Sequence, residues 1–444
     1  MQTIKEAVEK NRQLILDAER FIWEHPETGY REAVTSGYME EAFRALGYDL
    51  VCAEGLTGFY TRIETGRPGP EILVLAELDS VICLNHPDAD PKTGAVHSCG
   101  HHAQCAAMLG IAAALKNPAL LEGLSGNIRL CLVPAEEFLE IEYRLQLRKE
   151  GKIKYLGGKV EYLSRGYFDG VDIALMVHTS DNAVIESGAV GFLAKNIVYK
   201  GMAAHAGGSP WDGCNALYAA TCGINAVNAI RETFRERDVI RVHPIITKGG
   251  DAVNAIPEEV RLESYIRGTS FEGIIAANRK VNRALVGAAL SIGANIEIVD
   301  IPGYAPLKND DEMIALAKTA ADAVIPHQNC RMETRIDAGS TDMGDLSCIM
   351  PVIHPYCGGA KGSAHGKDYA IENIEMACVD SAKWQLAMIR LLLENGAQRA
   401  KQIVKDYKPM FTDKTAYLAY LDALDCCGDR IVYHSDGTAQ VDLK

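Results

Sequence analysis

The chain has 444 residues, of which 48% are apolar and 23% charged, so it holds enough apolar material for more than one compact domain. Its net charge of -14 at pH 7 supplies no overall basic face, which argues against binding to nucleic acid or to an anionic membrane. No apolar run approaches the roughly 20 residues of a membrane-spanning helix, and the charged, amphipathic N-terminus has no signal-peptide pattern. We therefore expect a cytoplasmic protein whose thirteen scattered cysteines are reduced thiols.

The first part of the chain alternates between helical and strand-like patterns. A helical pattern over residues 4–46 precedes an apolar, strand-like run at 71–78, and a helix is expected at 103–115. Two more buried strands are expected at 127–133 and 171–177. This alternation predicts the α/β fold class with a largely parallel sheet.

A second domain interrupts the first. After Ser187 the expected elements are a strand at 192–199, a helix at 215–234, strands at 239–247 and 259–267, a helix at 274–290 and a strand at 295–301. Their order, βαββαβ, is that of the ferredoxin-like split unit, which can form a small domain by itself. We therefore expect an inserted domain at 189–305.

The chain then returns to the first domain. The remaining expected elements are a helix at 310–324, a strand at 351–356 and a long helix at 371–394. The first domain is accordingly discontinuous and comprises residues 1–188 and 306–444. We assign no chemistry to the tail beyond residue 400.

The densest group of chemically active side chains is the stretch from His97 to His102, HSCGHH. Thiolate and imidazole are ligands for zinc and similar metals, and Gly100 lets the chain bend so that Cys99 and His101 can converge on one ion. A polar loop that caps the following helix is the alternative interpretation.

Glu136 and Glu137 directly follow the strand expected at 127–133. Adjacent carboxylates at a strand end repel each other and raise one pKa unless a cation or a hydrogen-bond donor compensates them. The pair therefore suggests a metal ligand beside a general base. A solvated surface turn is the alternative.

Other side chains able to bind metal follow other expected strands. His178 ends one strand, and Asp79 with Glu77 ends another. Because ligands bind at the carboxyl ends of the strands in open α/β sheets, these positions favour a single site at that edge. His365, in a Gly-rich loop, could add an imidazole from the far end of the chain, although structural or loop histidines are the alternatives.

Short motifs follow one another in order along most of the chain. They are HPETGYRE at 25–32, AELDS at 76–80, HSCGHH at 97–102, PAEE at 134–137, VH at 177–178, GMAAHAGGSPWDGCNAL at 201–217, NAIP at 254–257, STDMGDLS at 340–347 and AHGKDY at 364–369. Together they resemble the amidohydrolase branch of the aminoacylase-type metallopeptidases, which includes hippurate, auxin-conjugate and aminobenzoyl-glutamate hydrolases.

The resemblance implies two divalent metal ions, held by Cys99, His101, Glu137, His178 and His365. Cys99 would be the ligand shared by both ions. Glu136 would be the general base that takes a proton from the attacking water and later hands it to the leaving amine. Asp79 would orient the metal centre from behind its ligands.

The same resemblance makes the inserted domain a lid and a dimerisation domain. His205 would reach across a homodimer to stabilise the developing oxyanion. Asn254 and Arg267 would hold the free carboxylate of the substrate, for which the planar fork of arginine is suited.

Three departures from the family pattern concern the surroundings of the site. His102 stands where an acidic residue commonly follows, and the usual Ala-Leu-Pro after Asp79 is replaced by Ser80-Val81-Ile82. Residues 139–165 form a longer and more charged link than is usual in the family. We expect these departures to alter the second layer of residues around the metals, to add a competing ligand, or to change the entrance of the site.

The combined features predict a metal-dependent hydrolase that cleaves the amide bond of a small N-acyl amino acid or aminoacyl conjugate. The alternatives are a dipeptidase acting on an unblocked amine, a catalytically idle metal-bound binding module, and a closed structural zinc site with four ligands. Zinc or manganese is the expected metal, and cobalt or nickel would also accept these ligands.

Overall fold

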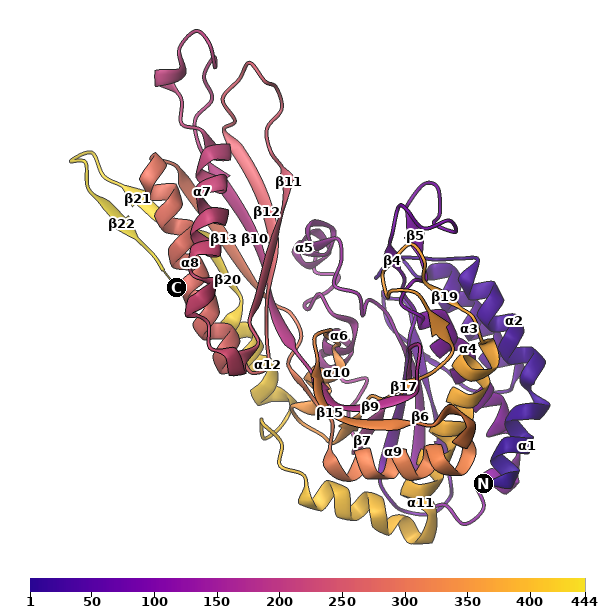
Figure 1. The fold of residues 1–444 in the computed structure, drawn as a ribbon. Helices are drawn as coiled ribbons and strands as arrows, with labels where there is room; N and C mark the ends of the chain where they lie inside the picture. The colour runs from indigo at the N-terminus through magenta and orange to yellow at the C-terminus, as the bar shows by residue number, and fades with distance from the viewer. Residues whose placement is uncertain (444) are drawn as a thin grey trace. The chain divides into compact units, whose positions relative to one another are not determined.

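The computed structural model describes residues 1–443 and divides the chain into two compact units (Figure 1). The first unit comprises residues 1–188, 307–337 and 341–414. The second comprises residues 189–306, 338–340 and the described chain from 415 onward. Each unit has a hydrophobic core of its own.

A six-stranded sheet forms the centre of the first unit. Its strands, in spatial order, are β1 (Val51–Cys52), β2 (Phe59–Glu64), β6 (Asn127–Val133), β3 (Glu71–Glu77), β7 (Ile173–Leu175) and β16 (Val352–Ile353). The pairs β6–β3, β3–β7 and β7–β16 are parallel, whereas β2 runs antiparallel to both of its neighbours, β1 and β6. The predicted α/β class with a largely parallel sheet is confirmed.

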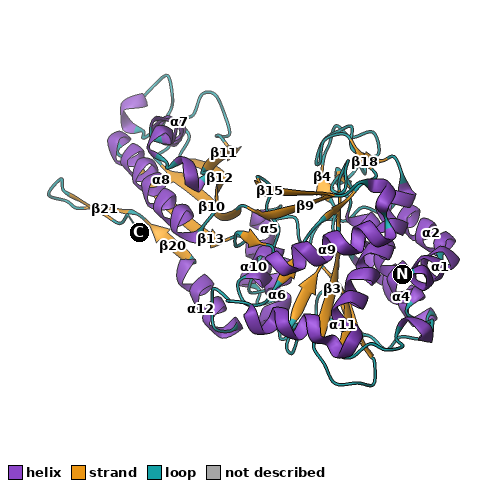
Figure 2. Cartoon of the chain, turned by 60° about the horizontal axis from the view of Figure 1, so that its bottom comes forward, coloured by secondary structure: helices purple, strands orange, loops and turns teal. Residues whose placement is uncertain are grey.

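The first unit also contains helices, some of which pack directly against this sheet. They are α1 (Gln2–Lys10), α2 (Arg12–Trp23), α3 (Ala33–Ala45), α4 (His101–Ala114), α5 (Ile141–Lys149), α6 (Gly158–Ser164), α9 (Asp311–Val324), α10 (Met343–Ser347) and α11 (Ser381–Asp406). Every residue of α4 is buried, as expected for a helix that is apolar all round. It packs against α2, α11 and β3, while α9 and α11 lie side by side (Figure 2).

A second, smaller sheet in the first unit was not predicted from the sequence. Its strands are β14 (Leu307–Lys308), β9 (Val184–Ala189), β17 (Tyr356–Cys357) and β8 (His178–Thr179), with β15 (Arg331–Asp337) paired to β9. Short hairpins, β4 (Val81–Ile82) with β5 (Ala95–Val96) and β18 (Ala360–Lys361) with β19 (Ala370–Ile371), complete the unit. The parallel pair β17–β8 places Tyr356 opposite His178.

The second unit is the expected βαββαβ fold. Its elements are β10 (Gly191–Lys200), α7 (Ala216–Ala229), β11 (Arg241–Lys248), β12 (Glu259–Gly268), α8 (Phe271–Ile292) and β13 (Asn295–Pro302). The antiparallel strand order β11-β12-β10-β13 is that of a ferredoxin-like sheet, which confirms the predicted fold of this segment. Alternate residues of β12, such as Val260 and Leu262, are buried against α7 and α8.

The C-terminal tail departs from the expected domain division, which placed all of 306–444 in the first domain. The helix α12 (Lys414–Leu424) leads to β20 (Cys426–Asp429), which pairs antiparallel with β13 as a fifth strand of the second unit's sheet (Figure 1). A hairpin of β21 (Ile431–Tyr433) and β22 (Ala439–Val441) follows. The segment CCGD has no strand-like alternation, so this pairing could not be predicted from the local pattern.

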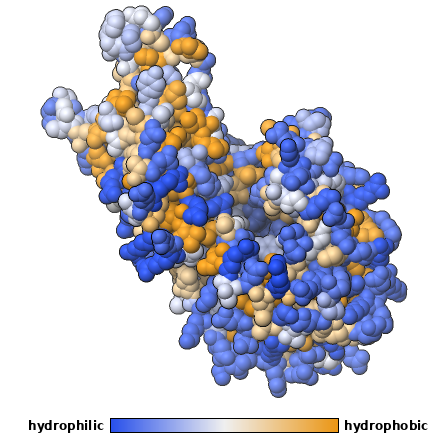
Figure 3. Space-filling view, in the orientation of Figure 1, coloured by the Kyte–Doolittle hydropathy of each residue, from blue (hydrophilic) through white to orange (hydrophobic). Residues whose placement is uncertain are grey.

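The described residues bear on three properties of the chain: membrane-spanning helices, disulfide bonds and exposed apolar side chains. None of their helices is both long enough and apolar enough to cross a membrane. None of the thirteen cysteines forms a disulfide bond. Large apolar side chains, among them Trp211, Tyr218, Ile245 and Val253, are exposed on the second unit, on which apolar patches are visible in Figure 3.

If the tail is part of the second unit's core, Ile431 must stabilise it. Ile431 is 1% exposed and belongs to that core, whereas its neighbour Val432 is 53% exposed. We predict that Ile431→Ala lowers the free energy of unfolding by about 2–5 kcal/mol, measured by urea denaturation. The matched variant Val432→Ala should cost less than about 1 kcal/mol. Equal effects of the two substitutions would contradict this assignment.

Candidate metal centre

The loop before α4 presents two of the candidate ligands. Gly100 caps α4 with φ +93°, a left-handed conformation, and a Cβ there would lie 2.5 Å from the hydroxyl of Tyr369. Glycine is therefore required at this bend. As a result α4 begins at His101, two residues earlier than expected, and Cys99 and His101 stand on either side of the turn.

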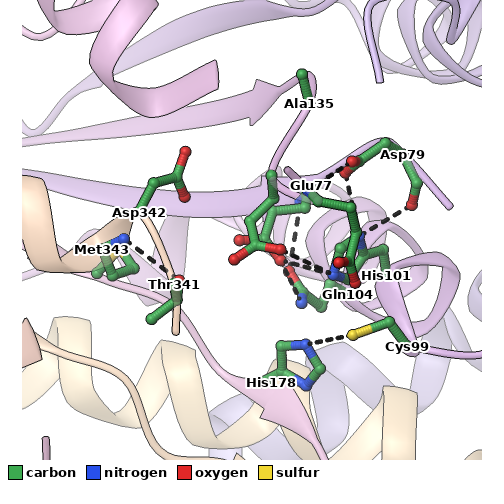
Figure 4. Close-up of polar contacts among 12 residues, drawn as sticks. Glu77, Asp79, Cys99, His101, Gln104, Ala135, His178, Thr341, Asp342 and Met343 are labelled. Atoms are coloured by element: carbon green, nitrogen blue, oxygen red, sulfur yellow. Dashed lines mark hydrogen bonds and ion pairs between the residues drawn. The ribbon is translucent and has the colours of Figure 1, made fainter. Parts of the chain in front are cut away.

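The structure gathers all five candidate ligands into two groups. One group is Cys99, His101 and His178, and the other is Cys99, Glu137 and His365; within each group the potential ligand atoms lie within 4.8 Å of one another. The Cys99 sulfur lies 3.6 Å from Nε2 of His178 (Figure 4), and Nε2 of His365 lies 2.9 Å from Oε1 of Glu137. The sulfur of Cys99 is therefore common to both groups.

Asp79 lies behind two of these ligands. Its Oδ1 is 3.2 Å from Nδ1 of His101, whose ring also lies 2.9 Å from the Asp79 carbonyl (Figure 4). Its Oδ2 accepts a 2.8 Å hydrogen bond from the backbone N–H of Glu137. Because Nδ1 is engaged in this way, Nε2 is the His101 nitrogen that faces the other ligands.

The donor set fits divalent metal ions. His101 Nε2 and Glu137 Oε1 are buried and meet the geometry of no hydrogen bond, and their near neighbours are other ionisable groups, Glu77 Oε2 at 3.2 Å and His365 Nε2 at 2.9 Å. Buried atoms of this kind are suited to bind a cation. Burial and Glu137 raise the pKa of the Cys99 thiol, but His101 and His178 outweigh them and leave it lowered to about 6. A thiolate is the form of cysteine that binds metal.

Glu136 lies beside the same groups. Its Oε2 is 3.9 Å from Nε2 of His101. Burial first, and then the charges of Glu77, Glu137 and Asp342, raise the pKa of Glu136 well above its usual value. The neighbouring carboxylates repel the negative charge of ionised Glu136, and a cation between them would offset this repulsion. The raised pKa of Glu136 is therefore consistent with a site that binds metal.

A buried network of charged side chains, which we did not predict, contacts His101. Glu77 Oε2 lies 3.2 Å from Nε2 of His101 and accepts a 2.9 Å hydrogen bond from Gln104, while Lys159 Nζ lies 2.5 Å from Glu77 Oε1. Lys159 also pairs with Asp342, and the Lys159, Glu77 and Asp342 side chains of these pairs are fully buried. The only sequence signal was the position of Glu77 at a strand end, because Lys159 lies in a stretch rich in charges.

The histidine that departs from the family pattern is not among these ligand groups. His102 packs 4.9 Å from the ring of Trp23, and its Nε2 lies 3.4 Å from Oε1 of Glu19 on α2. The ring of His354, by contrast, lies 5.7 Å from that of His178, and burial lowers its pKa to about 3. His102 therefore packs toward α2 and is not grouped with the candidate ligands as a competing ligand.

The other three candidate residues lie in the second unit. His205 and Asn254 adjoin, since His205 forms a bridge with Ala255 and the Asn254 carbonyl accepts a 2.9 Å hydrogen bond from the N–H after His205. Arg267 lies separately, on β12, where it stacks 5.4 Å from the Phe192 ring and donates a 2.7 Å hydrogen bond to Ser340.

A largely parallel α/β unit with thiolate, imidazole and carboxylate ligands at its strand ends defines a metal-dependent hydrolase. The chain belongs to the peptidase family M20/M25/M40, whose profile matches residues 74–390. All of the ordered motifs except HPETGYRE at 25–32 lie within the matched residues.

Curated relatives and solved structures agree with this assignment. The chain is 29% identical to the Xaa-Arg dipeptidase of Mus musculus over 360 residues, 76% of this chain and 74% of that protein. It is 28% identical to the indole-3-acetyl-aspartic acid hydrolase of Enterobacter agglomerans over 260 residues, 55% of each. A dinuclear metal-binding M20 peptidase from Bacillus subtilis shares the fold, with a TM-score of 0.63, 20% identity, and coverage of 87% of this chain and 99% of that one.

The buried network makes a prediction for Lys159. Lys159→Met would leave Glu77 and Asp342 without their shared positive partner, so we expect unfolding to become easier by about 3–5 kcal/mol. Lys152→Met, which removes an exposed lysine paired with Glu150, should cost less than about 1 kcal/mol. Urea denaturation measures both, and similar losses would show that the network contributes no special stability.

Proposed function

We propose that the protein hydrolyses the amide bond of a small N-acyl amino acid or aminoacyl conjugate, with two divalent metal ions and Glu136 as the general base. The observation that carries this proposal is the pair of ligand groups that share Cys99, with Glu136 beside them. Two groups with a common sulfur argue against a single closed zinc shell of four ligands.

Some of these residues would bind the metal ions, and Glu136 would transfer protons. Cys99, His101 and His178 would hold one ion, and Cys99, Glu137 and His365 the other. Bound divalent metal lowers the pKa of a water ligand and polarises the scissile carbonyl. Glu136, whose pKa is raised, accepts the proton of the attacking water and returns it to the leaving amine. Asp79 orients His101 and Glu137.

His205 is assigned to oxyanion stabilisation. Its Nδ1 accepts hydrogen bonds from the N–H groups of Gly207 and Gly208, at 3.1 and 2.9 Å, so Nε2 carries the proton and is the donor. Arg267 lies apart from Asn254 in the chain's own fold, so the two would bind the free carboxylate of the substrate together if Asn254, like its neighbour His205, reaches the site across the homodimer. The exposed apolar side chains of the second unit support the proposal that this unit forms a homodimer.

The proposal also covers the identity of the metal and the cellular location of the protein. Thiolate and imidazole favour zinc, while the carboxylates also accept manganese, cobalt or nickel. The thirteen cysteines, none of which forms a disulfide bond, support a reducing, cytoplasmic location. The partner is a small molecule, and the negative net charge argues against nucleic acid or a membrane as ligand.

A dipeptidase is the second candidate, and the Xaa-Arg dipeptidase relative favours it. The indole-3-acetyl-aspartic acid hydrolase relative favours an acylated substrate instead. The chemistry at the amide is the same for both, so the difference lies in whether a free amine is tolerated.

The general base gives the most direct prediction. Glu136→Gln removes the proton acceptor but leaves both ligand groups intact, so we expect kcat to fall by about 10²–10⁴-fold while elemental analysis still finds two metal ions per chain. Full amidase activity in this variant, with both ions bound, would refute the assigned mechanism.

The two candidate functions make opposite predictions about the substrate amine. Matched pairs of free and N-acetylated aminoacyl substrates, assayed with the metal-reconstituted enzyme, should show turnover of the acylated member. If acylation of the amine abolishes turnover, the dipeptidase is correct. If a broad panel shows no turnover with zinc, manganese, cobalt or nickel, the protein is an idle binding module.

A further inference from the structure

The loop that carries Glu136 has a backbone that needs outside support. Ala135, just before the proposed base, has φ +55°, a left-handed conformation that residues with a Cβ rarely adopt. Such a conformation persists only where the surroundings hold it. The peptide groups on both sides of Glu136 are therefore the places to look for that support.

Hydrogen bonds hold every one of those peptide groups. The N–H of Ala135 donates to Oε1 of the buried Glu32 at 2.8 Å, and its carbonyl accepts from the N–H of Gly158 at 3.1 Å. The N–H of Glu137 donates to Asp79 Oδ2 at 2.8 Å. Both carbonyls that flank Glu136, those of Ala135 and Glu137, also accept from one further side chain.

That side chain is Arg144 of α5. Its Nη1 donates to the carbonyls of Ala135 at 3.4 Å and Leu156 at 2.7 Å, and its Nη2 donates to the carbonyl of Glu137. Arg144 is 1% exposed. The rigid guanidinium fork thus joins three carbonyls, and the ammonium group of a lysine lacks this fixed planar geometry.

The surroundings of Arg144 are built to hold this fork. The guanidinium carbon lies 5.5 Å from the centre of the Tyr30 ring and 5.8 Å from that of Phe138. A Cβ at Gly29 would lie 2.4 Å from Nη2 of Arg144 and 2.9 Å from Cα of Ala135, so only glycine fits there. Gly29 and Tyr30 belong to the HPETGYRE motif, to which no chemistry was assigned. This motif therefore packs against Arg144 and Ala135.

We infer that Arg144 is a positioning residue for the reaction, one that fixes Glu136 as base and Glu137 as metal ligand by binding the carbonyls on either side of Glu136. The inference rests on the proposed function. It gives a role to the segment at 139–165, which the sequence marked as a departure from the family pattern. Arg144 contacts neither substrate nor metal in this role and acts only through the loop.

A purely structural role for Arg144 would be to anchor α5. The helix has a second anchor that can be removed separately, the ion pair between Arg31 and Glu140, with Nη1 and Oε1 2.6 Å apart and the Arg31 side chain 43% exposed. Arg31→Gln therefore tests the anchoring of α5 without touching the carbonyls at Glu136. Lys149→Met, on the exposed side of the same helix, controls for loss of a positive charge.

The experiment compares Arg144→Met and Arg144→Lys with these two controls in the full-length enzyme. We expect Arg144→Met to lower kcat by about 100-fold with KM changed less than about 3-fold, since the base is displaced while the substrate contacts remain. We also expect the affinity for the second manganese ion, measured by titration calorimetry of the metal-free protein, to fall by about 10–100-fold. Arg144→Lys should recover part of both losses, and both controls should match the wild type.

The outcomes separate this inference from the proposed function. If the wild type binds two ions and is active, but Arg144→Met keeps its kcat and its second metal ion, Arg144 is not a positioning residue. Equal losses in Arg31→Gln would assign the effect to the anchoring of α5 and also overturn the inference. If Arg144→Met does not fold, Arg144→Lys decides: wild-type kcat and metal affinity in that variant overturn the inference. A wild type without amidase activity or with fewer than two ions rejects the proposed function instead.

Discussion

The candidate metal centre depends on the sulfur of Cys99, because it is the one atom that belongs to both ligand groups. His101 and His178 reach it from the start of α4 and from β8, and Glu137 and His365 from the end of β6 and from the loop between β18 and β19. These segments are far apart in the chain. The parallel order of β6, β3 and β7 brings their carboxyl ends together, so the topology of the first unit is what makes a shared ligand available.

Buried negative charge is the second constraint on this unit. Carboxylates inside a protein are tolerated only with compensating charges or hydrogen bonds. Lys159 gives Glu77 and Asp342 a buried positive partner, and burial raises the pKa of Asp342 as well as that of Glu136. The cation thus balances the carboxylates that support the ligands, and the raised pKa of Glu136 suits the carboxyl that is proposed to receive and return a proton.

The alternation of helical and strand-like patterns along the sequence predicted the fold class, because these patterns are local. The ligand set instead came from the ordered motifs and their resemblance to a known family. The sequence did not predict the roles of Lys159 and Arg144, because both lie in a charged segment where nothing local distinguishes a buried cation from a solvated one. Nor did it predict the strand at Cys426–Asp429, whose partner β13 is distant in sequence and whose residues lack strand alternation. Tertiary contacts, not local preference, determine all three.

Anomalous diffraction from crystals grown with manganese tests the central claim most directly. We expect two anomalous peaks that flank the Cys99 sulfur, one beside His101 and His178 and the other beside Glu137 and His365. A single peak enclosed by four protein ligands, or two peaks that do not share Cys99, would contradict it.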